Sequence, residues 1–200
     1  MTIETLSIPA RDGFPLGATA YQPETNPTRT TISIHSATAV PQRFYRTLAS
    51  YLAQHGYRVV TYDYRGTGAS RPASSRGFKT RACDWALQDM AGVVDWVRST
   101  DRPQRHFLIG HSIGGQLVGL LPNGHLIDAM MGAYPHVTRR HVRPADIGRP
   151  GIGHFGYFRP GAERLWQAAI DWLEGVVPLP PAKLGPRPHT PAEASAASRG

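Results

Sequence analysis

Residues 106–121 read HFLIGHSIGGQLVGLL and decide how the centre of this chain folds. The run 106–109 is apolar and of strand type, and the run 113–121 repeats its apolar residues at helical spacing. Between the two runs lies a G-x-S-x-G pattern with Ser112 at its centre. The pattern predicts a sharp turn from strand to helix, which requires small residues two positions before and two positions after the serine.

The predicted turn places the hydroxyl of Ser112 at its apex, clear of the sheet. The following helix begins at the serine, and its N-terminus carries a partial positive charge and unpaired N–H groups. These features favour a nucleophile that attacks a group on which negative charge develops. The simpler alternative is a glycine-rich turn that connects a strand to a helix and performs no chemistry.

Apolar patterning elsewhere in the chain predicts alternating strands and helices after an initial hairpin around Asp12 and Gly13. This order predicts an α/β fold with a mostly parallel sheet and helices on both faces. In such sheets ligands bind beyond the carboxyl ends of the strands, where Ser112 and the loops 35–39 and 63–70 are expected. The predicted strands are 4–8, 16–21, 31–34, 58–62, 106–109 and 128–133, with a weak candidate at 137–142, and the predicted helices are 42–55, 84–99, 113–121 and 165–173.

The length of 200 residues predicts one domain with its own core. We assign residues 1–175 to this domain. Residues 176–200 are rich in proline and alanine and contain little that packs, so we expect them to be a disordered tail.

The net charge of +8 raises the question of nucleic-acid binding. The arginines are scattered except for a cluster at residues 139–143, and the sequence has no zinc-finger spacing. A nucleic-acid binder is therefore a third hypothesis that rests on charge alone, and we expect no nucleic-acid partner.

A single cysteine, Cys83, excludes an internal disulfide and indicates a reducing compartment. No apolar leader and no run of about 20 apolar residues is present, so we expect a cytoplasmic protein without membrane association. The histidines have no metal-ligand spacing, and we expect neither a metal nor a cofactor.

Three motifs occur in the order found in the α/β-hydrolase superfamily: HSAT at 35–38, DYRGTGAS at 63–70 and GHSIGG at 110–115. The chain resembles this superfamily on these motifs. The stretches VPQRFYR at 40–46 and IGHFGYFR at 152–159 are similar to one bacterial subgroup, the predicted hydrolases of serine-aminopeptidase-like type. The resemblance implies an esterase-like serine hydrolase that acts on a small carboxylic ester or a related acyl substrate.

The resemblance also implies roles for individual residues. Ser112 is expected to be the nucleophile, and His154 is expected to act as general base and then as general acid. The backbone N–H groups of Ile113 and Ala37 are expected to form the oxyanion hole. Ala39 stands where the subgroup is expected to have glycine, and this departure bears on the geometry of the loop.

Serine hydrolases of this type use a catalytic triad of serine, histidine and an acidic residue, and the sequence offers no clear candidate for the acidic residue. Asp128 and Asp146 are the only carboxylates between Ser112 and His154. Asp128 opens a predicted strand and would lie at the wrong end of the sheet. Asp146 preserves the order serine, acid, histidine, but its simpler interpretation is a solvated turn residue. Compared with the subgroup, the chain carries an internal deletion after Ala133, where the resemblance places the cap, the seventh strand and the acid.

Two hypotheses from different classes follow for the function. The first is a serine hydrolase that uses Ser112 and His154. The second is a catalytically inert, degenerate hydrolase fold that serves as a binding module or is a decayed product.

We expect His111 to pack away from the nucleophile. The three residues 134–136 are too few for a parallel crossover, so the segment 137–142 should pair antiparallel, lie at the sheet edge, or form no strand.

Overall fold

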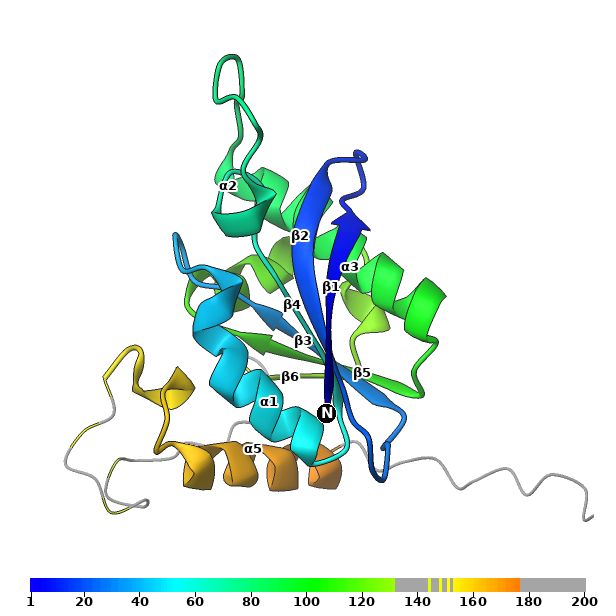
Figure 1. Cartoon of the computed structure of the whole chain (residues 1–200), viewed down its shortest axis with the longest axis vertical. Coiled ribbons are helices and arrows are strands. Elements are labelled where there is room, and N and C mark those ends of the chain that lie inside the picture. Colours follow the sequence, from blue (N-terminus) through cyan, green and yellow to red (C-terminus); the bar gives the residue numbers. More distant parts are fainter. Residues whose placement is uncertain (132–143, 145–147, 149–150, 152, 177–200) are drawn as a thin grey trace, which may run out of the picture.

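The computed structural model describes residues 1–131, 144, 148, 151 and 153–176, and its strands form one six-stranded sheet (Figure 1). The strands lie in the order β1-β2-β4-β3-β5-β6. The hairpin of β1 and β2 is antiparallel and pairs antiparallel with β4, whereas β4, β3, β5 and β6 run parallel to one another. The predicted fold class is confirmed. The bounds are β1 Thr2–Pro9, β2 Pro15–Gln22, β3 Thr30–His35, β4 Arg58–Tyr62, β5 Arg105–Gly110 and β6 Ala129–Met131.

The helices occur where the apolar periodicity predicts them, with one correction. The predicted helix 113–121 is wrong beyond Gln116, because the chain continues as a 3-10 turn and becomes extended at Leu121. Pro122 disfavours the helical conformation of the residue before it. The α-helices are α1 Arg46–Gln54, α2 Ala82–Asp84, α3 Ala91–Trp96, α4 Ile113–Gln116 and α5 Glu163–Val176. Other helical segments are 3-10 turns at Gln42–Tyr45, Gly68–Ser70, Leu117–Leu120, Gly124–Leu126 and Gly156–Phe158, and π-helical turns at Trp85–Met90 and Val97–Asp101.

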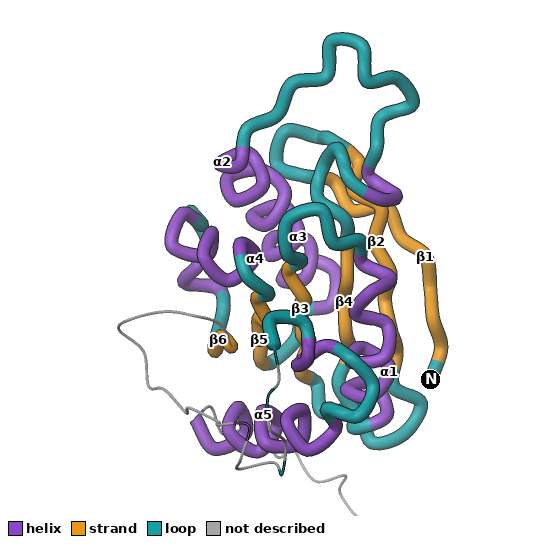
Figure 2. The backbone as a smooth tube through the Cα atoms, turned by 90° about the vertical axis from the view of Figure 1, so that its left-hand side faces the viewer, coloured by secondary structure: helices purple, strands orange, loops and turns teal. Residues whose placement is uncertain are grey.

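Apolar side chains form a cluster on each face of the sheet, and helices cover both clusters (Figure 2). On one face α1 and α5 pack on β3 and β5, and the ring of Tyr51 lies 5.1 Å from that of Trp166. On the other face α3 packs against the hairpin and β4. Arg105 at the start of β5 is buried and forms an ion pair of 2.8 Å with Glu174 of α5. The last helix is therefore held by apolar packing and by a charged pair.

A buried polar network lies inside the sheet. The hydroxyl of Ser33 is 2.9 Å from Nε2 of His35 and 2.9 Å from Nε2 of His106. The hydroxyl of Tyr62 is 2.7 Å from Nδ1 of His35. Burial lowers the pKa of His35 to about 3 and that of His106 to about 3. Both imidazoles are therefore neutral in the folded protein at neutral pH.

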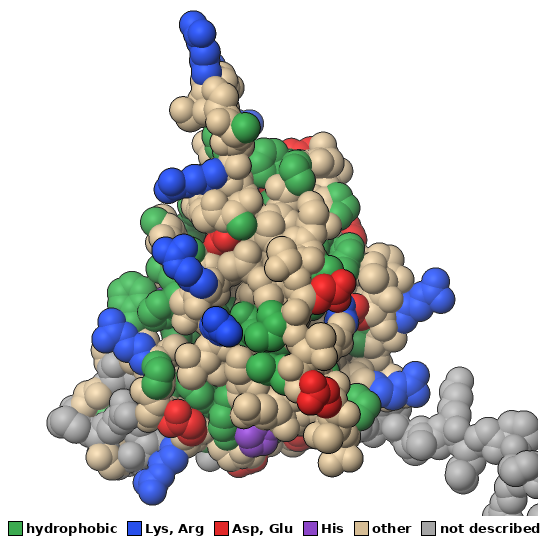
Figure 3. Space-filling view, viewed as in Figure 1, with side chains coloured by type: hydrophobic (Ala, Val, Ile, Leu, Met, Phe, Trp, Pro, Cys, Tyr) green, Lys and Arg blue, Asp and Glu red, His purple; other side chains and the backbone are tan. Residues whose placement is uncertain are grey.

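The candidate strand 137–142 lies outside the described residues, as does the segment 177–200. Helix α5 ends at Val176, one residue into the predicted tail. The face shown in Figure 3 carries its Lys and Arg side chains separately, without one continuous basic patch. No helix in the described part of the chain is both long enough and apolar enough to cross a membrane.

Candidate functional site

Ser112 lies at the turn between β5 and α4 in a strained backbone conformation. Its φ is 52° and its ψ is −119°, a combination that residues with a Cβ rarely adopt. A Cβ at Gly110 would overlap the backbone of Gly115, and a Cβ at Gly114 would overlap the carbonyl oxygen of His35. The predicted strand-to-helix turn and its need for small residues on either side of the serine are confirmed.

Two polar groups at this turn have no partner within the helix turn itself. The hydroxyl of Ser112 does not cap α4. The N–H of Ile113 donates to no backbone acceptor among the described residues, as expected for the first residue of a helix. A hydroxyl and a free N–H on adjacent residues are the minimum that acyl transfer requires of this turn.

The hydroxyl of Tyr45 connects the loop after β3 to the residue before the serine. The N–H of Ala37 donates to this hydroxyl over 2.9 Å, and the hydroxyl lies 2.9 Å from Nδ1 of His111. Which of the two groups donates in the bond between Tyr45 and Nδ1 depends on the tautomer of His111. The N–H of Ala37 is thus already engaged in this structure.

His111 is buried, and its Nε2 has no hydrogen-bond partner among the described residues. Burial lowers the pKa of His111, and the neighbouring His154 lowers it further, while the backbone of His154 acts in the opposite direction. The ring packs among aromatic side chains, with 4.3 Å between its centroid and that of Phe158. The expectation that His111 is a packing residue is confirmed, and its orientation away from the hydroxyl of Ser112 stays a prediction.

His154 lies on the loop before the turn Gly156–Phe158, and its side chain is exposed. Its ring centroid is 4.8 Å from that of His111, so the structure places it beside the residue that precedes Ser112. The next residue, Phe155, packs its ring against His111 at 5.2 Å. No hydrogen bond joins Ser112 to His154 in the described part of the chain. The proposed base is brought to the serine turn by aromatic packing.

Asp128, the one candidate acid within the described residues, does not lie beside His154. Asp128 precedes β6 at the opposite end of the sheet from Ser112, where it accepts from the N–H of His106 over 2.6 Å and pairs with Arg98 at 2.7 Å. Its expected position at the wrong end of the sheet is confirmed. Asp146 lies outside the described residues.

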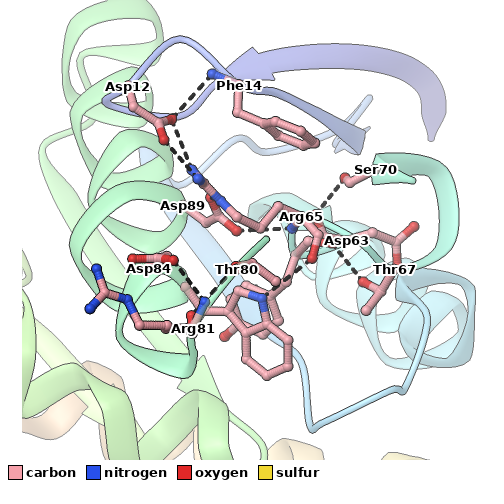
Figure 4. A network of polar contacts seen from close by, with 12 residues as sticks. Asp12, Phe14, Asp63, Arg65, Thr67, Ser70, Thr80, Arg81, Asp84 and Asp89 are labelled. Carbon is pink, nitrogen blue, oxygen red and sulfur yellow. Dashed lines mark hydrogen bonds and ion pairs between the residues drawn. The ribbon is translucent and has the colours of Figure 1, made fainter. Parts of the chain in front are cut away.

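The carboxylates around the loop 63–70 hold that loop in place (Figure 4). Asp63 accepts from the N–H groups of Gln42 at 2.7 Å and Ala69 at 2.8 Å. Arg65 pairs with Asp12 at 2.7 Å and with the buried Asp89 at 2.6 Å. Desolvation raises the pKa of Asp89 to about 6, against the opposite effect of Arg65. The motif DYRGTGAS thus forms a loop held by several carboxylates at the carboxyl end of β4, on the same edge of the sheet as Ser112.

Ala39 follows the Ala37 loop with a φ of 59°, a conformation that favours glycine. We expect Ala39→Gly to raise the free energy of unfolding by about 1 kcal/mol, because it removes the clash of Cβ with the backbone. Urea unfolding measures this change. Ala73→Gly is the matched control, since Ala73 is exposed and does not have a positive φ. A loss of stability in Ala39→Gly would contradict the prediction.

Sequence reasoning missed the role of Tyr45, which the structure reveals as the link between Ala37 and His111. The only available signal was its position in the stretch VPQRFYR at 40–46. The described residues include no group of three or more His, Cys, Asp or Glu side chains that could hold a metal ion.

Known proteins resemble this chain in sequence and in fold. The family described as serine aminopeptidase, S33, matches residues 27–127, a range that includes Ala37, the loop 63–70 and Ser112 and ends before His154. A protein of Yersinia enterocolitica named "Putative carbamate hydrolase RutD" is 28% identical over 160 residues, which cover 75% of this chain and 53% of the relative. The chain thus spans about half the length of this curated relative.

Solved structures share the architecture at low sequence identity. A thermostable carboxyl esterase of Bacillus coagulans gives a TM-score of 0.55 at 20% identity, covering 65% of this chain and 43% of that chain. A monoglyceride lipase of Saccharomyces cerevisiae gives a TM-score of 0.55 at 20% identity, covering 66% of this chain and 44% of that chain. These likenesses concern the fold alone.

Proposed function

Because the chain belongs to the serine aminopeptidase (S33) family of α/β hydrolases, we propose that it is a serine hydrolase that cleaves a carboxylic ester or a related acyl substrate. The observation that best supports this proposal is the geometry of Ser112. A strained apex holds an uncapped hydroxyl next to the free N–H of Ile113. Backbone strain of this kind is commonly found at functional sites.

In the proposed reaction, the Oγ of Ser112 attacks the substrate carbonyl carbon while His154 accepts the hydroxyl proton. The carbonyl oxygen becomes an oxyanion, which the N–H of Ile113 stabilises. The tetrahedral intermediate then collapses, and His154 returns the proton to the leaving alcohol. A water molecule, deprotonated by His154, hydrolyses the acyl-serine and restores the enzyme.

The second proposed oxyanion donor is the N–H of Ala37. In this structure it donates to Tyr45, so its use requires exchange of that hydrogen bond for one to the substrate. The hydroxyl of Tyr45 would keep its bond to His111 during the exchange. We propose that substrate entry drives this exchange.

The proposed base lacks a described carboxylate partner and is positioned by its packing on His111 and Phe155. In serine proteases, loss of the acid's function lowers kcat about ten-thousandfold. We therefore expect slow turnover if Asp146, the remaining candidate acid, does not orient His154. The names of the relatives include a carbamate hydrolase, a carboxyl esterase and a monoglyceride lipase, which support small carboxylic acyl compounds as the substrate class.

The competing proposal is an inert hydrolase fold that serves as a binding module. Two observations favour it: the N–H of Ala37 is already engaged, and no hydrogen bond joins Ser112 to His154 within the described residues. The two proposals differ in whether the hydroxyl of Ser112 is reactive.

A fluorophosphonate probe tests the reactivity of Ser112 directly. We expect covalent labelling of the full chain, complete loss of labelling in Ser112→Ala, and unchanged labelling in Ser99→Ala, which alters an exposed serine. Far-UV circular dichroism confirms that each variant is folded. A folded protein that takes up no label would contradict the hydrolase and support the inert fold.

A further inference from the structure

A cavity of about 410 Å³ lies at the end of the sheet opposite Ser112, beside the amino ends of β3 and β5. The loop between β2 and β3 forms one wall, and the turn 100–103 before β5 forms another. The N–H of Gln104 donates to the carbonyl of Arg29 over 2.9 Å, which fixes the two walls relative to each other. The proposed hydrolysis gives this cavity no role.

Positive charge dominates the lining of the cavity. Arg58 is paired at 2.6 Å with Asp101, whose side chain is almost fully buried and also accepts from the hydroxyl of Thr31. Arg29 and Arg102 are exposed, and neither forms an ion pair with any residue that the structure describes; Nε of Arg102 donates to the carbonyl of Ser99 over 3.3 Å. Two positive charges on the cavity wall are therefore uncompensated.

Both arginines occupy a left-handed backbone conformation, with a φ of 56° at Arg29 and 45° at Arg102. Turns that require this conformation usually contain glycine or asparagine, because a Cβ is unfavourable there. Here two neighbouring turns place a long cationic side chain at that position. Strained residues of this kind recur at ligand-binding sites, where the constraint positions a side chain.

The chemistry of the lining defines the ligand. A guanidinium forms paired hydrogen bonds with phosphate oxygens, and two guanidinium groups match the charge of a dianion. Three prolines, Pro23, Pro27 and Pro103, add rigid apolar surface to the same cavity. Its volume lies within the range of small-molecule sites. We propose that this cavity binds a small phosphate monoester, with the phosphate between Arg29 and Arg102 and the organic part against the prolines.

Isothermal titration calorimetry of the full chain at low ionic strength tests the proposal with AMP, inorganic phosphate and adenosine as probes. We expect AMP to bind most tightly, inorganic phosphate to bind more weakly, and adenosine to give no heat. The double variant Arg29→Asn/Arg102→Asn should lower the affinity for AMP by about 100-fold, or roughly tenfold for each arginine. Asparagine tolerates the left-handed conformation, so this variant keeps the backbone of both turns.

The matched control is Arg71→Asn/Arg76→Asn, which removes the same charge from the exposed loop 71–80. Its affinity for AMP should equal that of the unaltered chain, and Ser112→Ala should bind AMP equally well. Three results would each overturn the proposal: no heat with AMP, equal losses in the two double variants, or adenosine binding as tightly as AMP. None of these results bears on the reactivity of Ser112.

Discussion

Replacing His154 by alanine is expected to slow the reaction of Ser112 with a fluorophosphonate, and with a short p-nitrophenyl ester, by about 10²–10⁴-fold, the usual contribution of a general base. The neutral serine hydroxyl is a weak nucleophile, and its attack on the ester carbonyl needs an acceptor for its proton. The imidazole of His154 is exposed, and its ring centroid lies 4.8 Å from that of His111, the residue before the serine.

The matched control is His125→Ala, because His125 is exposed and lies in the short 3-10 turn before β6. Its rates should equal those of the unaltered chain. The double variant Ser112→Ala/His154→Ala should be no slower than Ser112→Ala alone, because residues that act as one unit are not additive. Labelling of His154→Ala at the unaltered rate would remove this histidine from the mechanism and leave Ser112 with another base.

Lowering the pH from 7 to 5 is expected to reduce the free energy of unfolding by about 3 kcal/mol. The pKa of His35 and of His106 is about 3 in the fold, against about 6.5 in an unfolded chain. Between these values the unfolded state binds more protons, so stability is complete above pH 6.5 and falls as the pH decreases toward 3. At pH 5 each of the two histidines lowers the free energy of unfolding by about 2 kcal/mol.

Asp89 acts in the opposite direction, because its pKa is raised to about 6 in the fold. It gains a proton in the folded state as the pH falls below 6, and this offsets about 1 kcal/mol of the loss at pH 5. The net loss of about 3 kcal/mol is a large fraction of the stability of a single domain.

Urea unfolding at a series of pH values measures this loss. His125→Gln, which removes an exposed histidine, should leave the pH dependence unchanged. His106→Gln should reduce the loss at pH 5 by about 2 kcal/mol, whatever its stability at pH 7. A free energy of unfolding that stays constant between pH 7 and pH 5 would show that the buried imidazoles are protonated in the fold without cost.

Local patterns in the sequence predicted most of the sheet, because burial in an α/β sheet produces apolar runs of strand length. The strand 58–62 was predicted with its observed bounds, and the helix 84–99 corresponds to the helical stretch 82–101. The helix predicted over 113–121 was too long, because its apolar residues repeat at helical spacing although Pro122 ends the helix early.

The sequence predicted the candidate site only where a single short motif determines the local backbone conformation. The G-x-S-x-G pattern fixed the apex at Ser112 because its glycines face backbone atoms. The contact of Tyr45 with His111 joins residues 66 positions apart and depends on tertiary packing that no local pattern reports. The same limit applies to the packing of His154 on His111, which arises from aromatic contacts between distant segments.

The anchoring of helix α5 has a consequence for protein engineering. Glu174 is tied to Arg105, and the indole N–H of Trp166 donates over 2.5 Å to the carbonyl of Tyr157, so the segment that follows His154 is attached to the body of the protein from its carboxyl side. The chain between β6 and this segment can therefore be lengthened without loss of that attachment. A segment grafted there from a longer homologue would be a route to test how such an insertion alters the access of small molecules to the turn at Ser112.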